Sequence, residues 1–248
     1  MKTTNPALST RVLEQFGRAG QAYTGETMTV EGTINKSALL LLLVVVPATW
    51  VWSQVMRGGL EAVMPWMWGG LLGGFVTALV TIFKKEWAPL TAPLYAALEG
   101  LAIGGLSAVF EMQYRGIVLP AVALTFGTLA CMLAVYRSGL IRVTDRFRLG
   151  VVAATGGIAL VYLATLVLSL FHVSVPFIYA GGTFGIVVSL VIVTVAALNL
   201  VLDFDFIDQA VGVGAPKYVE WYAAFGLMVT LIWLYLEMLR LLGKMRRR

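Results

Sequence analysis

The sequence predicts an all-α membrane protein, a polytopic bundle of seven transmembrane helices. Of its 248 residues, 59% are hydrophobic and only 12% are charged, whereas soluble domains carry about 25% charged residues. The apolar residues also form long blocks, and several reach the roughly 20 residues that a helix needs to cross a bilayer. Seven such helices with short loops use nearly the whole chain, so we expect a single domain embedded in the lipid bilayer.

The apolar blocks give the helices in order. We expect them over Ser37–Met56, Met64–Phe83, Leu90–Phe110, Ile117–Tyr136, Val151–Phe171, Phe177–Leu202 and Val219–Leu242. A short turn at His172–Pro176 joins the fifth helix to the sixth. The predicted organisation is therefore a polar N-terminal tail (1–36), a seven-helix transmembrane domain (37–242) and a basic C-terminal tail (243–248).

The basic residues indicate the orientation. Lys and Arg number four in the N-terminal tail, two after the second helix, four after the fourth and one after the sixth, eleven in all, against two on the other side. Because cytoplasmic loops are enriched in Lys and Arg, the N-terminus is expected in the cytoplasm. The C-terminal end, with Arg240 and Lys244, disagrees after seven crossings. Either the last helix does not cross fully, or the earlier helices decide the topology, which we favour.

Composition also argues against several classes of function. The net charge is +5, but the basic residues sit between apolar blocks, so we expect no nucleic-acid partner. Cys131 is the only cysteine and His172 the only histidine, and neither belongs to a zinc motif or a serine-protease pair. The glycine-rich segment GVGAP lacks the aspartate of an intramembrane aspartyl protease. We expect no enzymatic activity and no cofactor.

Five acids lie within or beside predicted helices, and an acid in a membrane is a functional candidate because its burial is costly. They are Glu99, Asp203, Asp205, Asp208 and Glu237. Asp205 and Asp208 share a helix face, whereas Asp203 and Asp205 point to nearly opposite sides.

Each candidate also has a purely structural interpretation. For Glu99, a neutral acid bonded to a neighbouring helix explains the sequence as well as a functional role does. Asp203 follows an apolar run of 26 residues, so the acids after it fit a solvated helix end. Glu237 fits a surface ion pair with Arg240, three residues on. If Asp203 and Glu237 lie close together, however, they can share a proton or bind a hard cation such as Ca²⁺ through their oxygens.

Four stretches carry a resemblance to a known family: YAALEGLAIGG, GIVLPAVALTFGTLACMLAVY, VLDFDFI and LYLEMLRLLG. Because these stretches follow one another in this order along seven helices, the chain resembles the bacterial branch of the Bax inhibitor-1 (transmembrane Bax inhibitor motif) family. The resemblance covers Lys36–Met245. The resemblance implies a fold in which the seventh helix is surrounded by the other six. It also implies a pH-sensitive calcium leak in the bacterial plasma membrane, gated by a proton-sensing pair of acids between helices six and seven.

The resemblance assigns these roles to particular residues. Asp203 matches the acid of helix six, Asp205 falls where the family often has an amide, and Glu237 matches the acid of helix seven. A basic residue that latches onto the pair falls at Lys84 or Lys85. The chain departs from the family in having Glu for Asp in helix seven and Lys for Arg at the latch, which loses a bidentate contact.

The spacing of the two acids tests the implied pair. They are 34 residues apart, and Glu237 lies about 27 Å beyond the predicted start of its helix at Val219. The two meet only if helix six continues well past Asp203 or helix seven starts later.

A regulatory or scaffold protein that acts on a membrane protease or a stress-response partner is the competing function. The polar N-terminal tail is its natural contact. A leak predicts that Asp203→Asn or Glu237→Gln changes the pH dependence of Ca²⁺ flux, whereas a scaffold predicts a partner that co-purifies despite those substitutions.

Overall fold

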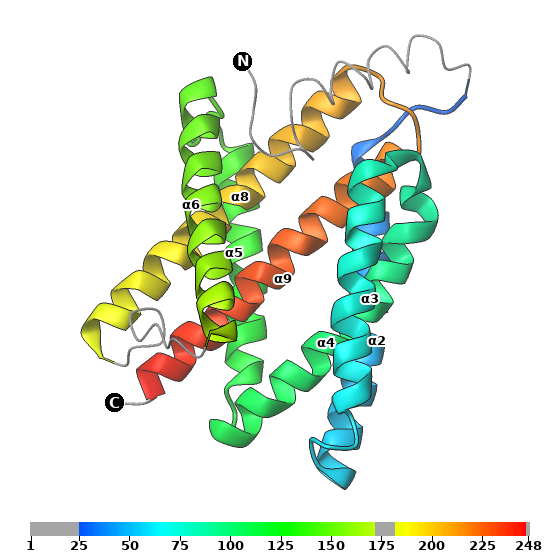
Figure 1. The fold of residues 1–248 in the computed structure, drawn as a ribbon. Helices are drawn as coiled ribbons and strands as arrows, with labels where there is room; N and C mark the ends of the chain where they lie inside the picture. Colours follow the sequence, from blue (N-terminus) through cyan, green and yellow to red (C-terminus); the bar gives the residue numbers. More distant parts are fainter. Residues whose placement is uncertain (1–24, 172–181, 247–248) are drawn as a thin grey trace. The chain divides into compact units, whose positions relative to one another are not determined.

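The structure, a computed structural model, describes residues 25–171 and 182–246, and this part of the chain is helical (Figure 1). The elements are α2 (Val30–Gly58), α3 (Met64–Phe83), the short 3₁₀ helix η1 (Lys85–Trp87), α4 (Ala88–Gln113), α5 (Val118–Arg137), α6 (Asp145–Leu170), α8 (Thr183–Gly212) and α9 (Val219–Arg246). Within the described residues, seven helices are long and apolar enough to cross a membrane. The predicted fold class is confirmed.

Several helices begin earlier or end later than predicted. The first helix begins at Val30, not Ser37, and the fifth at Asp145, not Val151. In each, a threonine caps the N-terminus: the side chains of Thr29 and Thr144 accept hydrogen bonds from backbone N–H groups three residues on.

The helices therefore extend into the predicted tails, while the division into tails and transmembrane domain stays a prediction. Polar residues before the apolar blocks form first turns, so residues 30–36 are helical. At the other end, α9 continues to Arg246 instead of ending at Leu242. The predicted turn at His172–Pro176 lies outside the described residues.

The chain divides into two compact units. The α2–α4 unit consists of the described part of Pro6–Arg115 together with Phe206–Val229. The α5–α6 unit contains Gly116–Asp205 and Thr230–Arg248. Helices α8 and α9 contribute to both units, because the division falls within each of them.

Glycines bring the helices of the α2–α4 unit close together. A Cβ added to Gly104 of α4 would lie 2.5 Å from the carbonyl oxygen of Ala48 in α2, and one on Gly70 of α3 would lie 2.5 Å from that of Leu98 in α4. A Cβ on Gly100 would overlap the α2 backbone in the same way. Backbone contact of this kind holds helices together where lipid provides no hydrophobic drive.

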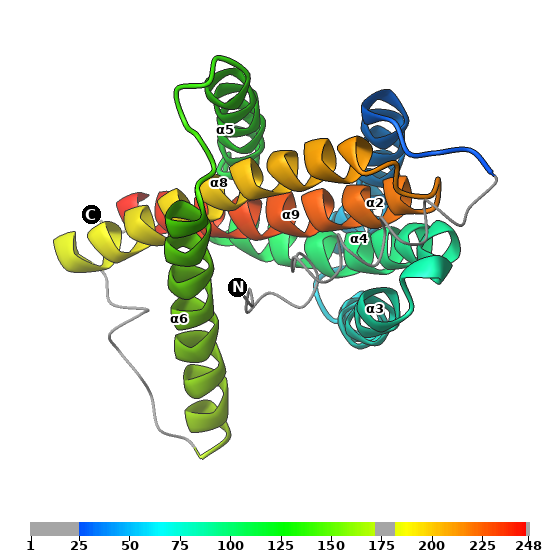
Figure 2. The ribbon, with the colours of Figure 1, turned by 90° about the horizontal axis from the view of Figure 1, so that it is seen from above.

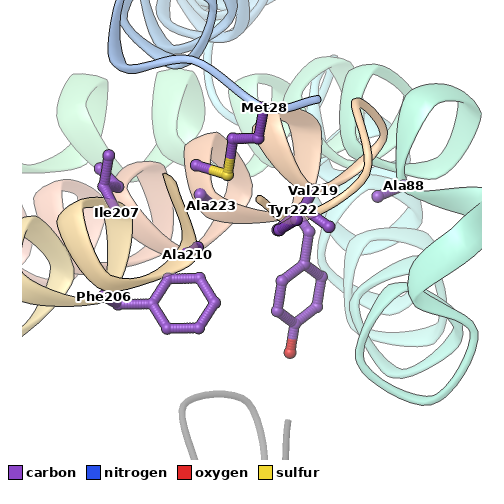
Figure 3. Packing of buried hydrophobic residues seen from close by; sticks show 9 residues of the cluster. Met28, Ala88, Phe206, Ile207, Ala210, Val219, Tyr222 and Ala223 are labelled. Atoms are coloured by element: carbon purple, nitrogen blue, oxygen red, sulfur yellow. The ribbon is translucent and has the colours of Figure 1, made fainter. Parts of the chain in front are cut away.

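A buried cluster fixes one end of the α2–α4 unit (Figure 3). Its residues are Met28, Ala88, Phe206, Ile207, Ala210, Ala215, Val219, Tyr222 and Ala223. They come from the segment before α2, the start of α4, the end of α8, the turn that follows it and the start of α9. The backbone N–H of Met28 donates to the carbonyl of Ala215 over 2.7 Å. The segment before α2 is thereby attached to the α8–α9 turn.

Helices α8 and α9 form an antiparallel hairpin, and Figures 1 and 2 both show them side by side. Near the end of α9, the ammonium of Lys244 donates to the carbonyl of Gly185 and the hydroxyl of Ser189, both near the start of α8. The end of α9 therefore reaches the beginning of α8. This geometry favours a last helix of full length over one that stops short.

Helix α6 presents one face to the protein. The residues along it whose side chains are described as not exposed are Phe147, Arg148, Val151, Val152, Thr155, Ile158, Tyr162 and Thr165, at spacings of one, three or four positions. Its other faces are mostly exposed, as expected for a helix in contact with lipid. In their most apolar stretches, α5 and α6 each bury only 11% of the residues.

Candidate functional site

Asp203 is buried in the α8–α9 hairpin with incomplete hydrogen bonding. The residue is 5% exposed, and its side chain forms a hydrogen bond with Thr230 of α9. Its second carboxyl oxygen, Oδ2, has no hydrogen-bond partner among the described residues. A buried carboxylate without a compensating charge is strongly unfavourable, so this oxygen calls for a proton or a cation.

Glu237 is buried in a different environment. It is 1% exposed, and its Oε1 accepts hydrogen bonds of 2.6 Å from both the Tyr162 hydroxyl and Arg240. Arg240 also donates to the Tyr162 oxygen over 3.0 Å. The predicted Glu–Arg pair is confirmed, but its carboxylate lies inside the protein and not on the surface.

Asp205 forms an ion pair with Arg148 of α6. Asp203 contacts α9 while Asp205 contacts α6, which agrees with the prediction that their side chains point to different sides. Asp205 is largely buried rather than solvated. The predicted loop around Arg148 is helical, and this moves the arginine onto the face of α6 that meets α8.

The two acids of the predicted pair have separate partners. Helix α8 does continue past Asp203 to Gly212, so the first condition for their meeting is met. Thr230, which bonds to Asp203, nevertheless lies seven residues before Glu237, or about 10 Å along α9. No hydrogen bond joins the two carboxyls in the described part of the chain, and their direct pairing stays a prediction.

No group of three or more His, Cys, Asp or Glu residues in 25–171 and 182–246 is placed to hold a metal ion. Binding of Ca²⁺ by Asp203 and Glu237 therefore also stays a prediction.

The predicted latch residues follow α3. Lys84 is exposed and forms the C-terminal cap of that helix. The Lys85 ammonium lies 5.9 Å from the centre of the Tyr222 ring, at the start of α9. The latch role stays a prediction for both.

The remaining candidates are Glu99 and Asp208. Glu99 is half-buried and forms a hydrogen bond with Tyr95, one turn earlier in α4. The structural interpretation expected a partner in a neighbouring helix, but this partner lies in the same helix as Glu99. A Cβ on Gly74 of α3 would lie 3.2 Å from the Glu99 carboxyl, so this glycine makes room for the acid. Asp208 is exposed.

Sequence reasoning missed a fully buried acid, Glu220, at the start of α9. Its carboxylate accepts from the Thr29 backbone N–H over 2.9 Å and from the Thr29 hydroxyl over 3.0 Å. It also forms ion pairs with Lys36 and, at 3.4 Å, with Lys217. A Cβ on Gly32 would overlap this carboxylate, so the glycine permits its approach to the N-terminus of α2.

Sequence reasoning also missed three residues of α6: Arg148, Thr155 and Tyr162. Thr155 accepts a hydrogen bond of 2.8 Å from Asn199 of α8, and the other two contact acids as described above. Their spacing of seven residues was a usable signal, because it places them on one face of a helix.

Comparison with known proteins agrees with the fold. The family described as "Bax inhibitor 1 like" matches residues 5–247, nearly the whole chain. Searches of the curated proteins and of the solved structures gave no match. The family match covers all seven predicted membrane-spanning helices. The chain therefore belongs to the Bax inhibitor 1 like family of membrane proteins.

Proposed function

We propose that this protein is a proton-sensitive cation leak of the bacterial plasma membrane, with its N-terminus in the cytoplasm and with no enzymatic activity. Calcium is the first cation to test. One observation carries the proposal: Asp203 is buried in a predicted membrane-spanning helix, and one of its carboxyl oxygens has no hydrogen-bond partner among the described residues. Ionisable groups in such positions are expensive and mark ion or proton paths.

In this proposal, Asp203 exchanges a proton for a cation. A carboxylate oxygen is a suitable ligand for a hard cation such as Ca²⁺, and protonation removes that ligand. Thr230 holds one oxygen of Asp203 while the other is available. Glu237 is the second acid of the path, about 10 Å further along α9. Arg240 neutralises it in the arrangement described here.

Ca²⁺ flux into proteoliposomes, measured from mildly acidic to mildly alkaline pH, tests the proposal. We expect wild-type flux to change with pH, and Asp203→Asn to flatten that dependence because an amide neither titrates nor binds Ca²⁺ strongly. Asp145→Asn is the matched control, since Asp145 is an exposed residue in the first turn of α6. It should follow the wild type. A Ca²⁺ flux that changes neither with pH nor on Asp203→Asn substitution would contradict the proposed leak.

A scaffold that acts on a membrane protease or a stress-response partner is the second candidate. It is favoured by the attachment of the segment before α2 to the α8–α9 turn, through Met28–Ala215 and through the Lys217 N–H to Glu26 carbonyl bond of 3.1 Å. A protein bound to the polar tail would thus be connected to the start of α9. A partner that co-purifies equally with wild type and Asp203→Asn, from a protein without flux, would establish this alternative.

A further inference from the structure

Three polar residues of α6 form a row that meets the α8–α9 hairpin. Arg148 pairs with Asp205, the Thr155 hydroxyl accepts from Asn199, and the Tyr162 hydroxyl donates to Glu237. Each is seven residues from the next. All of these contacts lie within the α5–α6 unit.

The row extends along most of a membrane span. Seven residues advance an α-helix by about 10 Å and rotate it about 20° short of two full turns. Arg148 and Tyr162 are therefore about 21 Å apart along one face of α6, compared with a hydrocarbon thickness of about 30 Å. The residues on the other faces of this stretch, such as Leu160 and Leu163, are apolar and exposed. Helix α6 thus carries a row of three polar side chains within a predicted span.

The hairpin supplies complementary groups along the same line. Asp205 and Glu237 face α6 through charged or hydroxyl partners, and Arg240 adds a cation over the Tyr162 ring at 5.1 Å. Asp203 lies one helical turn from Asn199 along α8, and its side chain bonds to Thr230 of α9. This acid, whose Oδ2 has no partner among the described residues, is therefore one turn along α8 from the middle contact of the row, on the side of α9.

Helix association alone does not account for this choice of residues. A hydrogen bond between membrane helices contributes about 0.6 kcal/mol on average, and neutral serines or threonines would supply it. Carboxylates and arginines add a large desolvation cost that a buried ion pair barely offsets. A seam that accepts water and charge in another state would explain their repeated use.

We infer that the seam between α6 and the α8–α9 hairpin is the path of the proposed leak. The inference rests on that proposed function and adds which helices line the path. The ligand is a metal cation that keeps part of its water shell. In the arrangement described here, the three α6 contacts close the seam. Opening separates Arg148 from Asp205 and Tyr162 from Glu237, and the released carboxylates then line the path with Asp203.

Substituted-cysteine labelling tests the inference in the full-length protein. The exposed Cys131 is first replaced by alanine, and Thr155→Cys is then introduced. Leu163→Cys, on the exposed side of the same helix, is the matched control. Proteoliposomes are treated with a membrane-impermeant cationic methanethiosulfonate reagent. We expect Thr155→Cys to be labelled much faster than Leu163→Cys and to lose most of its Ca²⁺ flux on labelling.

The outcomes for the seam and for the leak are separable. If the cysteine-free protein leaks but Thr155→Cys is labelled no faster than Leu163→Cys, the path lies elsewhere and the leak stands. If no variant leaks, the proposed function fails, and the labelling rate still reports whether water reaches the seam. Ile158→Cys, on the same face of α6, replaces Thr155→Cys if that variant does not fold, and equal labelling with Leu163→Cys overturns the inference.

Discussion

The two units of this protein hold their helices together in different ways. In the α2–α4 unit, glycines allow backbones to touch, and α4 buries 50% of its most apolar stretch. In the α5–α6 unit, α5 and α6 each bury 11%, and α6 meets the hairpin through polar contacts. Close backbone packing has one stable arrangement, whereas polar contacts can be exchanged for water or ions. Under the proposed leak, we therefore assign the switching to the α5–α6 unit and a constant framework to the α2–α4 unit.

The acids of α9 and α8 show the same contrast. Glu220, in the α2–α4 unit, has four hydrogen-bond or ion-pair contacts to two lysines and Thr29. Asp203, in the α5–α6 unit, keeps one oxygen without a partner in the described structure. In a buried carboxylate with a complete set of donors the desolvation cost is offset, whereas one with an incomplete set can still accept a proton or a cation.

The largest expected effect concerns backbone packing. Gly100→Ala places a methyl group against the backbone of α2 at Val44, and we expect a loss of about 3 kcal/mol in unfolding free energy because the backbone cannot yield cheaply. Gly127→Ala in α5 is the control, since nothing lies within 4 Å of its added Cβ. Denaturant unfolding in detergent micelles measures both. Equal losses would remove the distinction between the units.

The next effect concerns Glu220, the acid with a complete set of partners. Lys36→Met removes the closest cation of the fully buried Glu220, and breaking a buried pair in this way costs about 3 kcal/mol, reduced here by the remaining contact with Lys217. Asp203→Asn should leave the stability unchanged or raise it, because it removes an uncompensated acid. If Asp203→Asn is as destabilising as Lys36→Met in the same unfolding assay, the contrast between the two acids is wrong.

A smaller effect is expected at the ion pair of α6. Arg148→Asp places two acids together, whereas the double exchange Arg148→Asp with Asp205→Arg restores an opposite-charge pair. We expect the exchange to recover about 1 kcal/mol relative to the sum of the single variants. Additive single effects, measured by thermal unfolding in detergent, would show that the pair does not couple α6 to α8.

The smallest effect lies outside the membrane spans, at Lys217. The neighbouring Glu220 carboxylate raises the pKa of the Lys217 ammonium above its ordinary value of 10.5. Its stabilising contribution is therefore fully present below pH 10.5 and is lost as the pH rises through the higher pKa of the folded state. The melting temperatures of wild type and Lys217→Gln should differ at neutral pH and converge in strong alkali. A constant difference at all pH values would contradict this.

The fold was predictable because long apolar blocks leave few alternatives in a membrane. The errors were at helix ends, where Thr29 and Thr144 cap helices that begin in polar sequence. Polar residues near an apolar block look like a tail when hydropathy alone is considered. Capping residues and the first-turn acids Glu31 and Asp145 were the signals that would have corrected the boundaries.

The candidate site was predictable only in part. Asp203 and Glu237 stand out because they are acids in apolar surroundings. Glu220 does not, since it follows the polar segment after α8, and its partner Lys36 is 184 residues away. Arg148 and Asp205 are 57 residues apart. Local patterns do not reveal which distant helices meet, so partners of this kind emerge only from the folded chain.

Infrared difference spectroscopy of the protein in lipid membranes tests the central claim most directly, because it detects the carbonyl stretch of a protonated carboxylic acid. On acidification, we predict a band in the wild type that is missing in Asp203→Asn and that Ca²⁺ suppresses. This result would show that proton and cation compete for Asp203. A band that persists in Asp203→Asn, or one that Ca²⁺ leaves unchanged, would contradict the account.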